Sequence, residues 1–229
     1  MKLTAVELPH VRADRSQALL VVLILADLVV VSPLAELGIL NRALSDAMFI
    51  LALIAGVGAV FSRLTLARLF VIVACGSILM RFATMWFGSR EMLAIDAALT
   101  LTAESLLALV LLHHLFWAGG RVTMYRVIGA IAVYLLIGLV FAQVYRLLAL
   151  LAARPFAIDG IAAGYDLVSP RLNYFSFVTL TSLGANDMLA VHPVGRALVV
   201  LEALVGILYP PVLIARLVAL QLAAAPDPR

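Results

Sequence analysis

The most informative stretch of the chain is NYFSFVTLTSLGAND, residues 173–187. Its first part, residues 173–180, is apolar and aromatic, but it is less than half as long as the roughly 20 residues that a helix needs to cross a bilayer. Its second part, residues 181–187, is rich in Thr, Ser, Gly and Asn. A short apolar helix followed by such a polar turn predicts a re-entrant element. Because non-helical backbone at membrane depth must be buried in protein or line a water-filled cavity, we expect this loop to face an aqueous path.

The composition of the whole chain is that of an integral membrane protein. Of the 229 residues, 65% are hydrophobic and 13% are charged, whereas soluble proteins are roughly 45–50% apolar and about 25% charged. The formal net charge of +3 is too small and too dispersed to indicate a nucleic-acid partner. A single cysteine, Cys75, excludes an intrachain disulfide and a multi-cysteine metal site. The partner that these values indicate is the lipid bilayer.

Six stretches are apolar and long enough to be spanning helices, five before the re-entrant segment and one after it. The predicted fold class is an all-α membrane protein with six transmembrane helices and a re-entrant helix and loop between helices 5 and 6. We expect a four-helix peripheral membrane domain over residues 1–120 and a second membrane domain, which holds the re-entrant element, over residues 121–229. The first span is expected to close at Pro33, because proline interrupts a helix. The predicted spans are residues 17–32, 42–61, 66–87, 92–117, 127–151 and 194–222.

The distribution of arginine predicts the orientation. With the N-terminus in the cytoplasm, the cytoplasmic ends of the spans carry more Lys and Arg than the outer ends, which is the bias of the positive-inside rule. Six spans then place the C-terminus in the cytoplasm as well. Arginine replaces lysine almost throughout, which is typical of GC-rich bacterial genomes, so we expect the bacterial cytoplasmic (inner) membrane.

Motifs on both sides of the polar turn keep a fixed order: an aromatic pair, a hydroxyl pair, a glycine, an acid, a Gly-Arg pair and a further glycine. They are Tyr174-Phe175, Thr181-Ser182, Leu183-Gly184, Asp187, Gly195-Arg196 and Gly206. In this order, residues 125–222 resemble the pore domain of the tetrameric potassium-channel superfamily. The wider arrangement is similar to that of small bacterial six-helix ion channels.

The resemblance implies a homotetramer in which four filter loops meet on one axis, and passive passage of K⁺ or Na⁺ with no cofactor and no enzymatic step. Backbone carbonyls of the filter would hold the monovalent cation, because carbonyl oxygens replace its hydration shell. The filter positions so implied are Thr181, Ser182, Leu183, Gly184, Ala185, Asn186 and Asp187. Support from the pore helix is implied for Tyr174, Phe175 and Val178. A gating hinge is implied at Gly206, Pro210 and Pro211. These residues are expected to interrupt the helix, and the bend either gates or is a static kink that fits the neighbouring helices.

Two filter positions depart from the family pattern. Ala185 stands where the family has the filter tyrosine, and Asn186 stands where it has the second glycine. Asn tolerates left-handed backbone better than other non-glycine residues, so the turn at Asn186 remains feasible. The missing ring at Ala185 leaves the filter without its brace, and we expect weak potassium selectivity.

These observations predict a monovalent cation channel subunit, potassium-channel-like with weakened or altered selectivity. Two alternatives remain open. One is a non-conducting channel-like scaffold or subunit. The other is a small membrane transporter, which needs a polar cavity within one protomer. The predicted fourth span has no arginine, which excludes gating by an arginine-bearing voltage sensor. Residues 217–229 are too few for a nucleotide- or calcium-binding module, so a stimulus is expected to act on the membrane part or through a separate partner.

Four ionisable residues within the predicted spans have two interpretations each. Glu202 lies four residues before Gly206, so it is either a carboxylate that concentrates cations near the cavity or filter, or a buried acid bonded to the pore helix through Thr179 or Thr181. Charged groups are costly in lipid unless they face the protein interior. Asp27, Arg81 and Glu104 therefore either pair with one another and hold the peripheral helices together, or relay protons.

Overall fold

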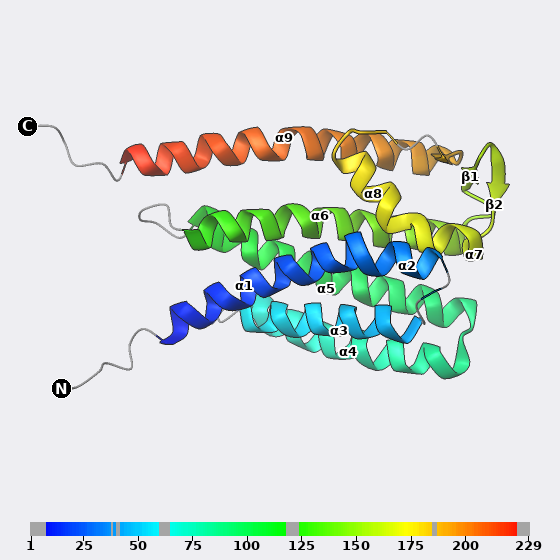
Figure 1. The fold of residues 1–229 in the computed structure, drawn as a ribbon, viewed down its shortest axis with the longest axis horizontal. Helices are drawn as coiled ribbons and strands as arrows, with labels where there is room; N and C mark the ends of the chain where they lie inside the picture. The colour runs from blue at the N-terminus through cyan, green and yellow to red at the C-terminus, as the bar shows by residue number, and fades with distance from the viewer. Residues whose placement is uncertain are drawn as a thin grey trace, which may run out of the picture.

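The computed structural model describes residues 8–37, 39, 42–59, 65–117, 124–184 and 187–223. The long helices lie side by side along one axis, and the strands gather at the end of the molecule opposite the start of α1 and the end of α9 (Figure 1). In chain order, the elements are α1 (Leu8–Ala26), the π-helix η1 (Asp27–Val31), α2 (Ser32–Glu36), α3 (Arg42–Ala59), α4 (Thr65–Phe87), α5 (Arg90–Trp117), α6 (Met124–Leu151), β1 (Phe156–Ile158), β2 (Ile161–Ala163), α7 (Tyr165–Val168), the 3₁₀-helix η2 (Ser169–Arg171), α8 (Leu172–Leu180), β3 (Met188–Ala190) and α9 (Pro193–Ala223).

The described part of the chain contains five helical segments that are long and apolar enough to cross a membrane. The expected second span is the exception. Helix α3 covers it, and among the residues whose side chains the structure describes its apolar segment is Ala47–Gly58. The chain is thus mostly helical, as expected for an α-helical integral membrane protein. The five segments are Ser16–Leu34, Thr65–Thr84, Arg90–Leu115, Arg126–Leu151 and Pro193–Leu222.

The first span does not close at Pro33, so that expectation is wrong. The helical path continues through η1 into α2, which ends at Glu36. Proline has no N–H, and its ring clashes with the carbonyl four residues earlier. The wider π-turn accommodates the proline: the Ser32 N–H donates to the Asp27 carbonyl, five residues back rather than four.

Besides the helices, the described residues form a small antiparallel sheet of order β2-β1-β3. Its central strand pairs Phe156 with Ala163 on one side and with Ala190 on the other. Strand β3 directly follows the predicted filter loop. The Asp159 N–H also donates to the Asp187 carbonyl over 3.0 Å. The sheet therefore fixes the point at which the chain leaves the loop.

One hydrophobic core joins the peripheral helices to the predicted pore unit. It includes Leu20 of α1, Phe70 of α4, Leu107 of α5, Val133 of α6 and Phe177 of α8. The core therefore continues across residue 120, where the sequence suggested a domain boundary.

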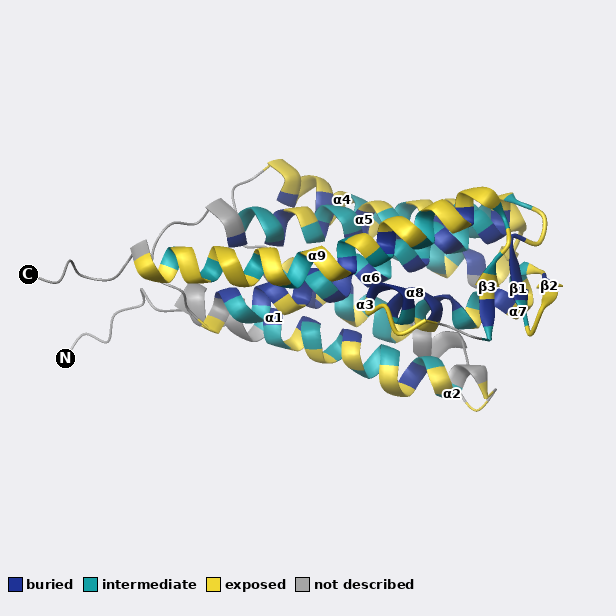
Figure 2. Ribbon diagram, turned by 90° about the horizontal axis from the view of Figure 1, so that it is seen from above, coloured by how far each residue is buried: buried dark blue, intermediate teal, exposed yellow. Residues whose placement is uncertain are grey.

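Helix α9 contributes little to this core. In its most apolar stretch 11% of residues are buried, compared with 50% in α6. Figure 2 shows α9 largely exposed along its length. Large apolar side chains such as Val200, Leu204 and Leu208 are more than half exposed on it.

Candidate functional site

Helix α8 is the short apolar helix that the sequence predicted at residues 173–180. It extends from Leu172 to Leu180, lies between α6 and α9, and runs obliquely to both (Figure 1). Phe175 is 3% exposed and packs edge-on against Tyr145 of α6, with ring centroids 5.1 Å apart. Tyr174 is 44% exposed, and Val178 is half-buried. Of the three predicted supporting residues, Phe175 is therefore the one packed into the protomer.

Glu202 of α9 is fully buried against the middle of α8. Its Oε1 lies 2.5 Å from the Ser176 hydroxyl, and its Oε2 accepts a hydrogen bond of 2.6 Å from the Tyr145 hydroxyl. The Ser176 oxygen is also 2.6 Å from the Gly138 carbonyl, so its single proton can serve one of the two acceptors at a time. This arrangement is a buried acid bonded to α8 and α6, with Ser176 and Tyr145 as partners rather than Thr179 or Thr181.

Two glycines let α8 approach its neighbouring helices closely. A Cβ at Gly206 of α9 would overlap the carbonyl oxygen of Leu180, at the end of α8. A Cβ at Gly138 of α6 would lie 2.8 Å from the ring of Phe177. The Tyr134 hydroxyl lies 3.5 Å from the same Leu180 oxygen. Gly206 is therefore a backbone-to-backbone contact between α9 and the end of α8.

The loop after α8 starts with a tightened helix end. The Ser182 N–H donates to Thr179 over 2.9 Å and the Leu183 N–H donates to Val178 over 3.0 Å. The Thr181 hydroxyl donates back to the Phe177 carbonyl over 2.7 Å.

The loop itself is exposed and has unusual backbone angles. Ser182 has φ +57° and Gly184 has φ +81°, both in the left-handed region that favours glycine. All residues from 181 to 184 are exposed, whereas Asp187 is half-buried. The two departures from the family pattern, Ala185 and Asn186, lie outside the described residues.

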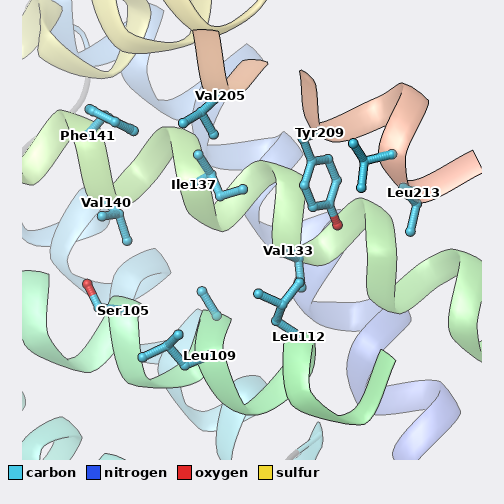
Figure 3. Close-up of a pocket in the computed structure, with 12 residues that line it drawn as sticks. Ser105, Leu109, Leu112, Val133, Ile137, Val140, Phe141, Val205, Tyr209 and Leu213 are labelled. Carbon is cyan, nitrogen blue, oxygen red and sulfur yellow. The ribbon is translucent and has the colours of Figure 1, made fainter. Parts of the chain in front are cut away.

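Helix α9 continues through Pro210 and Pro211, so the expected interruption is absent. Each proline removes one donor, which leaves the carbonyls of Gly206 and Ile207 without their helical partners while the flanking turns persist. Beside the two prolines, an apolar pocket of about 460 Å³ lies between α9, α5 and α6 (Figure 3). Tyr209 projects between the helices there, and its hydroxyl donates to the Ala130 carbonyl over 2.9 Å.

Arginines of α4 and α6 form ion pairs with an acid of α5, Asp96, that the sequence interpretation did not single out. Asp96 is 1% exposed, and its Oδ2 forms ion pairs with the guanidinium groups of Arg81, at 3.3 Å, and Arg146, at 3.0 Å. Asp27 instead accepts a hydrogen bond of 3.5 Å from Asn173, in the first turn of α8.

Sequence reasoning also missed Ser176, Tyr145 and Gly138. Ser176 and Asp96 carried a signal, since each is a polar side chain within an apolar stretch. Gly138 and Tyr145 had none, because their roles depend on which helix packs against them.

A comparison with known protein families finds a match in the same part of the chain. The family model described as "Ion channel" matches residues 133–221, a segment that contains most of α6, all of α8 and most of α9. No match was found among curated proteins or among solved structures. Over residues 133–221, the chain is therefore similar to an ion channel domain.

Proposed function

We propose that the chain is one subunit of a passive monovalent cation channel, in which four copies surround an axial pore. The observation that carries this proposal is the exposure of the predicted filter loop and α9 in a single protomer. Neighbouring copies would cover apolar side chains of α9 that in a single chain are exposed. A groove of about 420 Å³ between Ser182, Gly184 and Val200 offers a neighbouring loop a place to dock.

In the proposed path, an ion meets Asp187 first, passes the backbone of residues 182–186, and enters a cavity lined by α9. Carbonyl oxygens along such a path replace the hydration shell of the ion. The buried Ser176–Glu202–Tyr145 contacts would hold α8, and with it the loop, at a fixed depth. Because Ala185 lacks the ring of the family tyrosine, we expect K⁺ to be only weakly preferred over Na⁺.

For gating, we assign the flexible point to Pro210 and Pro211, where two helical hydrogen bonds are missing. The apolar pocket next to Tyr209 leaves space for the following part of α9 to swing. During this motion, α9 would keep its contact with α8 at Gly206.

A cysteine-modification experiment tests whether ions pass the loop. In a Cys75→Ser background, Leu183→Cys places a thiol on the loop, at a position that is 79% exposed. A cationic methanethiosulfonate reagent should then block cation flux into liposomes. The control is Ile72→Cys on α4, which is 67% exposed and distant from the loop in sequence, and should not be blocked. Flux that survives complete modification of Leu183→Cys would contradict the proposed path.

A transporter is the second candidate, because a polar cavity of about 460 Å³ lies within one protomer. It is lined by Asp27, Arg81 and Glu104, among others. A transporter would show saturating flux that the modification of residue 183 leaves unchanged, and it would need no tetramer.

A further inference from the structure

Glu202 lies in the middle of a chain of oxygen atoms that connects three helices. The Tyr145 hydroxyl of α6 is 2.6 Å from Glu202 Oε2, and Glu202 Oε1 of α9 is 2.5 Å from the Ser176 hydroxyl of α8. The chain returns to α6, because the Ser176 oxygen is also 2.6 Å from the Gly138 carbonyl. Tyr145, Ser176 and Glu202 are fully buried within one protomer, so neither bulk water nor a neighbouring copy of the chain reaches them.

The two hydroxyl groups do not have enough protons for the three contacts. Each of the three distances is that of an O–H···O hydrogen bond, which requires one proton between its two oxygens. Tyr145 supplies one proton and Ser176 supplies another, whereas a backbone carbonyl such as that of Gly138 supplies none. The third proton therefore has to come from the carboxyl group of Glu202.

An ionised Glu202 would leave one of the contacts without a proton. The Ser176 proton would turn toward the carboxylate, and the Ser176 oxygen would then face the Gly138 carbonyl oxygen at 2.6 Å with no hydrogen between them. Two acceptor oxygens at this distance repel each other. With a proton on Glu202 Oε1, every contact is satisfied. Oε1 donates to Ser176, which donates to Gly138, while Tyr145 donates to Oε2.

The charges around Glu202 also favour its neutral form. A buried carboxylate needs a cation beside it, but within the described part of the chain Glu202 takes part in no ion pair. Arg146 of α6 pairs with Asp96. Arg196 of α9 donates to the Ala190 carbonyl over 3.4 Å. The other ionisable side chains on the adjoining turns of α6 and α8 are phenols, which carry no charge near neutral pH: Tyr134, Tyr145 and Tyr174.

We propose that Glu202 is an un-ionised carboxylic acid in the folded chain, and that its proton completes the hydrogen bonds that tie α8 to α6 and α9. When alkaline solution removes this proton, the contact between Ser176 and Gly138 becomes repulsive, and α8 should move away from α6 at this point. The contact is therefore sensitive to pH. It does not depend on the proposed channel function, because the proton count is the same whether or not ions pass the loop.

The direct test is infrared spectroscopy of the purified chain near neutral pH, in a detergent that contains no ester or carboxyl group. We expect the wild-type chain to show the carbonyl band of an un-ionised carboxyl group that Glu202→Gln removes. Glu91→Gln is the matched control, since Glu91 is exposed at the start of α5, and it should leave this band unchanged. If Glu202→Gln removes a carboxylate band instead, the proposal is overturned.

The pH dependence of unfolding, followed by circular dichroism in detergent, gives a second measurement. A glutamate in an unfolded chain ionises at about pH 4.3, so near neutral pH the folded chain holds one proton at Glu202 that the unfolded chain has lost. Stability should therefore fall as the pH rises, until the folded chain also releases the proton. The unfolding equilibrium constant of the wild type, relative to that of Glu202→Gln, should increase about tenfold for each pH unit. Equal pH dependence in the two proteins would overturn the proposal.

Tyr145→Phe keeps the proposal testable if Glu202→Gln does not fold. This substitution removes the hydrogen bond to Oε2, which is the carbonyl oxygen of the un-ionised carboxyl group. A C=O bond vibrates at a higher frequency when it loses a hydrogen bond, so the band should shift upward rather than disappear. Thr102→Ala, which removes an exposed hydroxyl of α5, should leave the band in place. A band that does not move in Tyr145→Phe belongs to another carboxyl group, and the assignment of the proton to Glu202 is then wrong.

Discussion

Gly206 and Gly138 let α8 lie close to α9 and α6, and neither position has room for a side chain. In Gly206→Ala, the added methyl group would displace the backbone at Leu180. Overpacking of this kind costs about 1–3 kcal/mol, which for a chain of this size lowers Tm by roughly 2–12 °C. Thermal unfolding in detergent, followed by circular dichroism, measures the loss.

The control for this substitution is Gly76→Ala in α4, where a Cβ would meet nothing within 4 Å. It should leave Tm unchanged or raise it slightly, because alanine favours helix more than glycine. An equal loss of Tm in both variants would contradict the contact role of Gly206.

Glu202 gives a second prediction at the scale of single residues. Tyr145→Phe removes the donor to Glu202 Oε2 and leaves that buried oxygen without a partner. The free energy of unfolding should fall by about 1–3 kcal/mol. Thr102→Ala removes a hydroxyl that is exposed and bonded within its own helix, so its effect should stay within roughly 0.5 kcal/mol. If the free energy of unfolding falls equally in Tyr145→Phe and Thr102→Ala, the Tyr145–Glu202 hydrogen bond does not stabilise the fold more than an exposed one.

The filter departures give a third prediction. Ala185→Tyr combined with Asn186→Gly restores the aromatic ring and the glycine of the family pattern. We expect the permeability ratio of K⁺ over Na⁺ to rise, measured from reversal potentials of the double variant and the wild-type chain. An unchanged ratio would argue against the register in which Thr181–Asp187 is compared with the family filter.

At the scale of elements, the test concerns α9. Replacing Pro210 and Pro211 with alanine supplies the N–H donors that the carbonyls of Gly206 and Ile207 lack. The helix should become stiffer, and single-channel records should show fewer transitions between open and closed levels. Val218→Ala is the control, since Val218 lies further along the same helix, is 53% exposed and is outside the pocket, and it should retain the wild-type frequency. If the proline variants retain it too, the flexible point lies elsewhere.

The sequence predicted individual elements better than their contacts. The helix at residues 173–180 and the turn after it follow from local composition, because lipid requires an apolar surface and a satisfied backbone. The continuation past Pro33 was not predictable from local rules, since a π-turn absorbs the proline there. The sheet escaped prediction because its strands are three residues each and pair across the loop. The Ser176–Glu202 contact depends on how α8 and α9 are rotated, which periodicity does not determine.

At the scale of the whole molecule, the proposed pore requires four chains. In the proposed assembly, neighbouring copies cover the exposed face of α9 and the groove beside Ser182 and Val200. Native mass spectrometry of the protein released from detergent should therefore give a tetramer. If the chain remains monomeric in nanodiscs at the protein densities used for flux measurements, the proposed axial pore is contradicted.

The measurement that tests the central claim most directly is the reversal potential in a planar bilayer, with equal concentrations of K⁺ on one side and Na⁺ on the other. The account predicts a clear current that reverses close to zero, since a filter without the family tyrosine and second glycine passes both ions. A reversal potential displaced far toward the K⁺ equilibrium value would contradict the weakened selectivity. The absence of any current from a verified tetramer would contradict conduction itself.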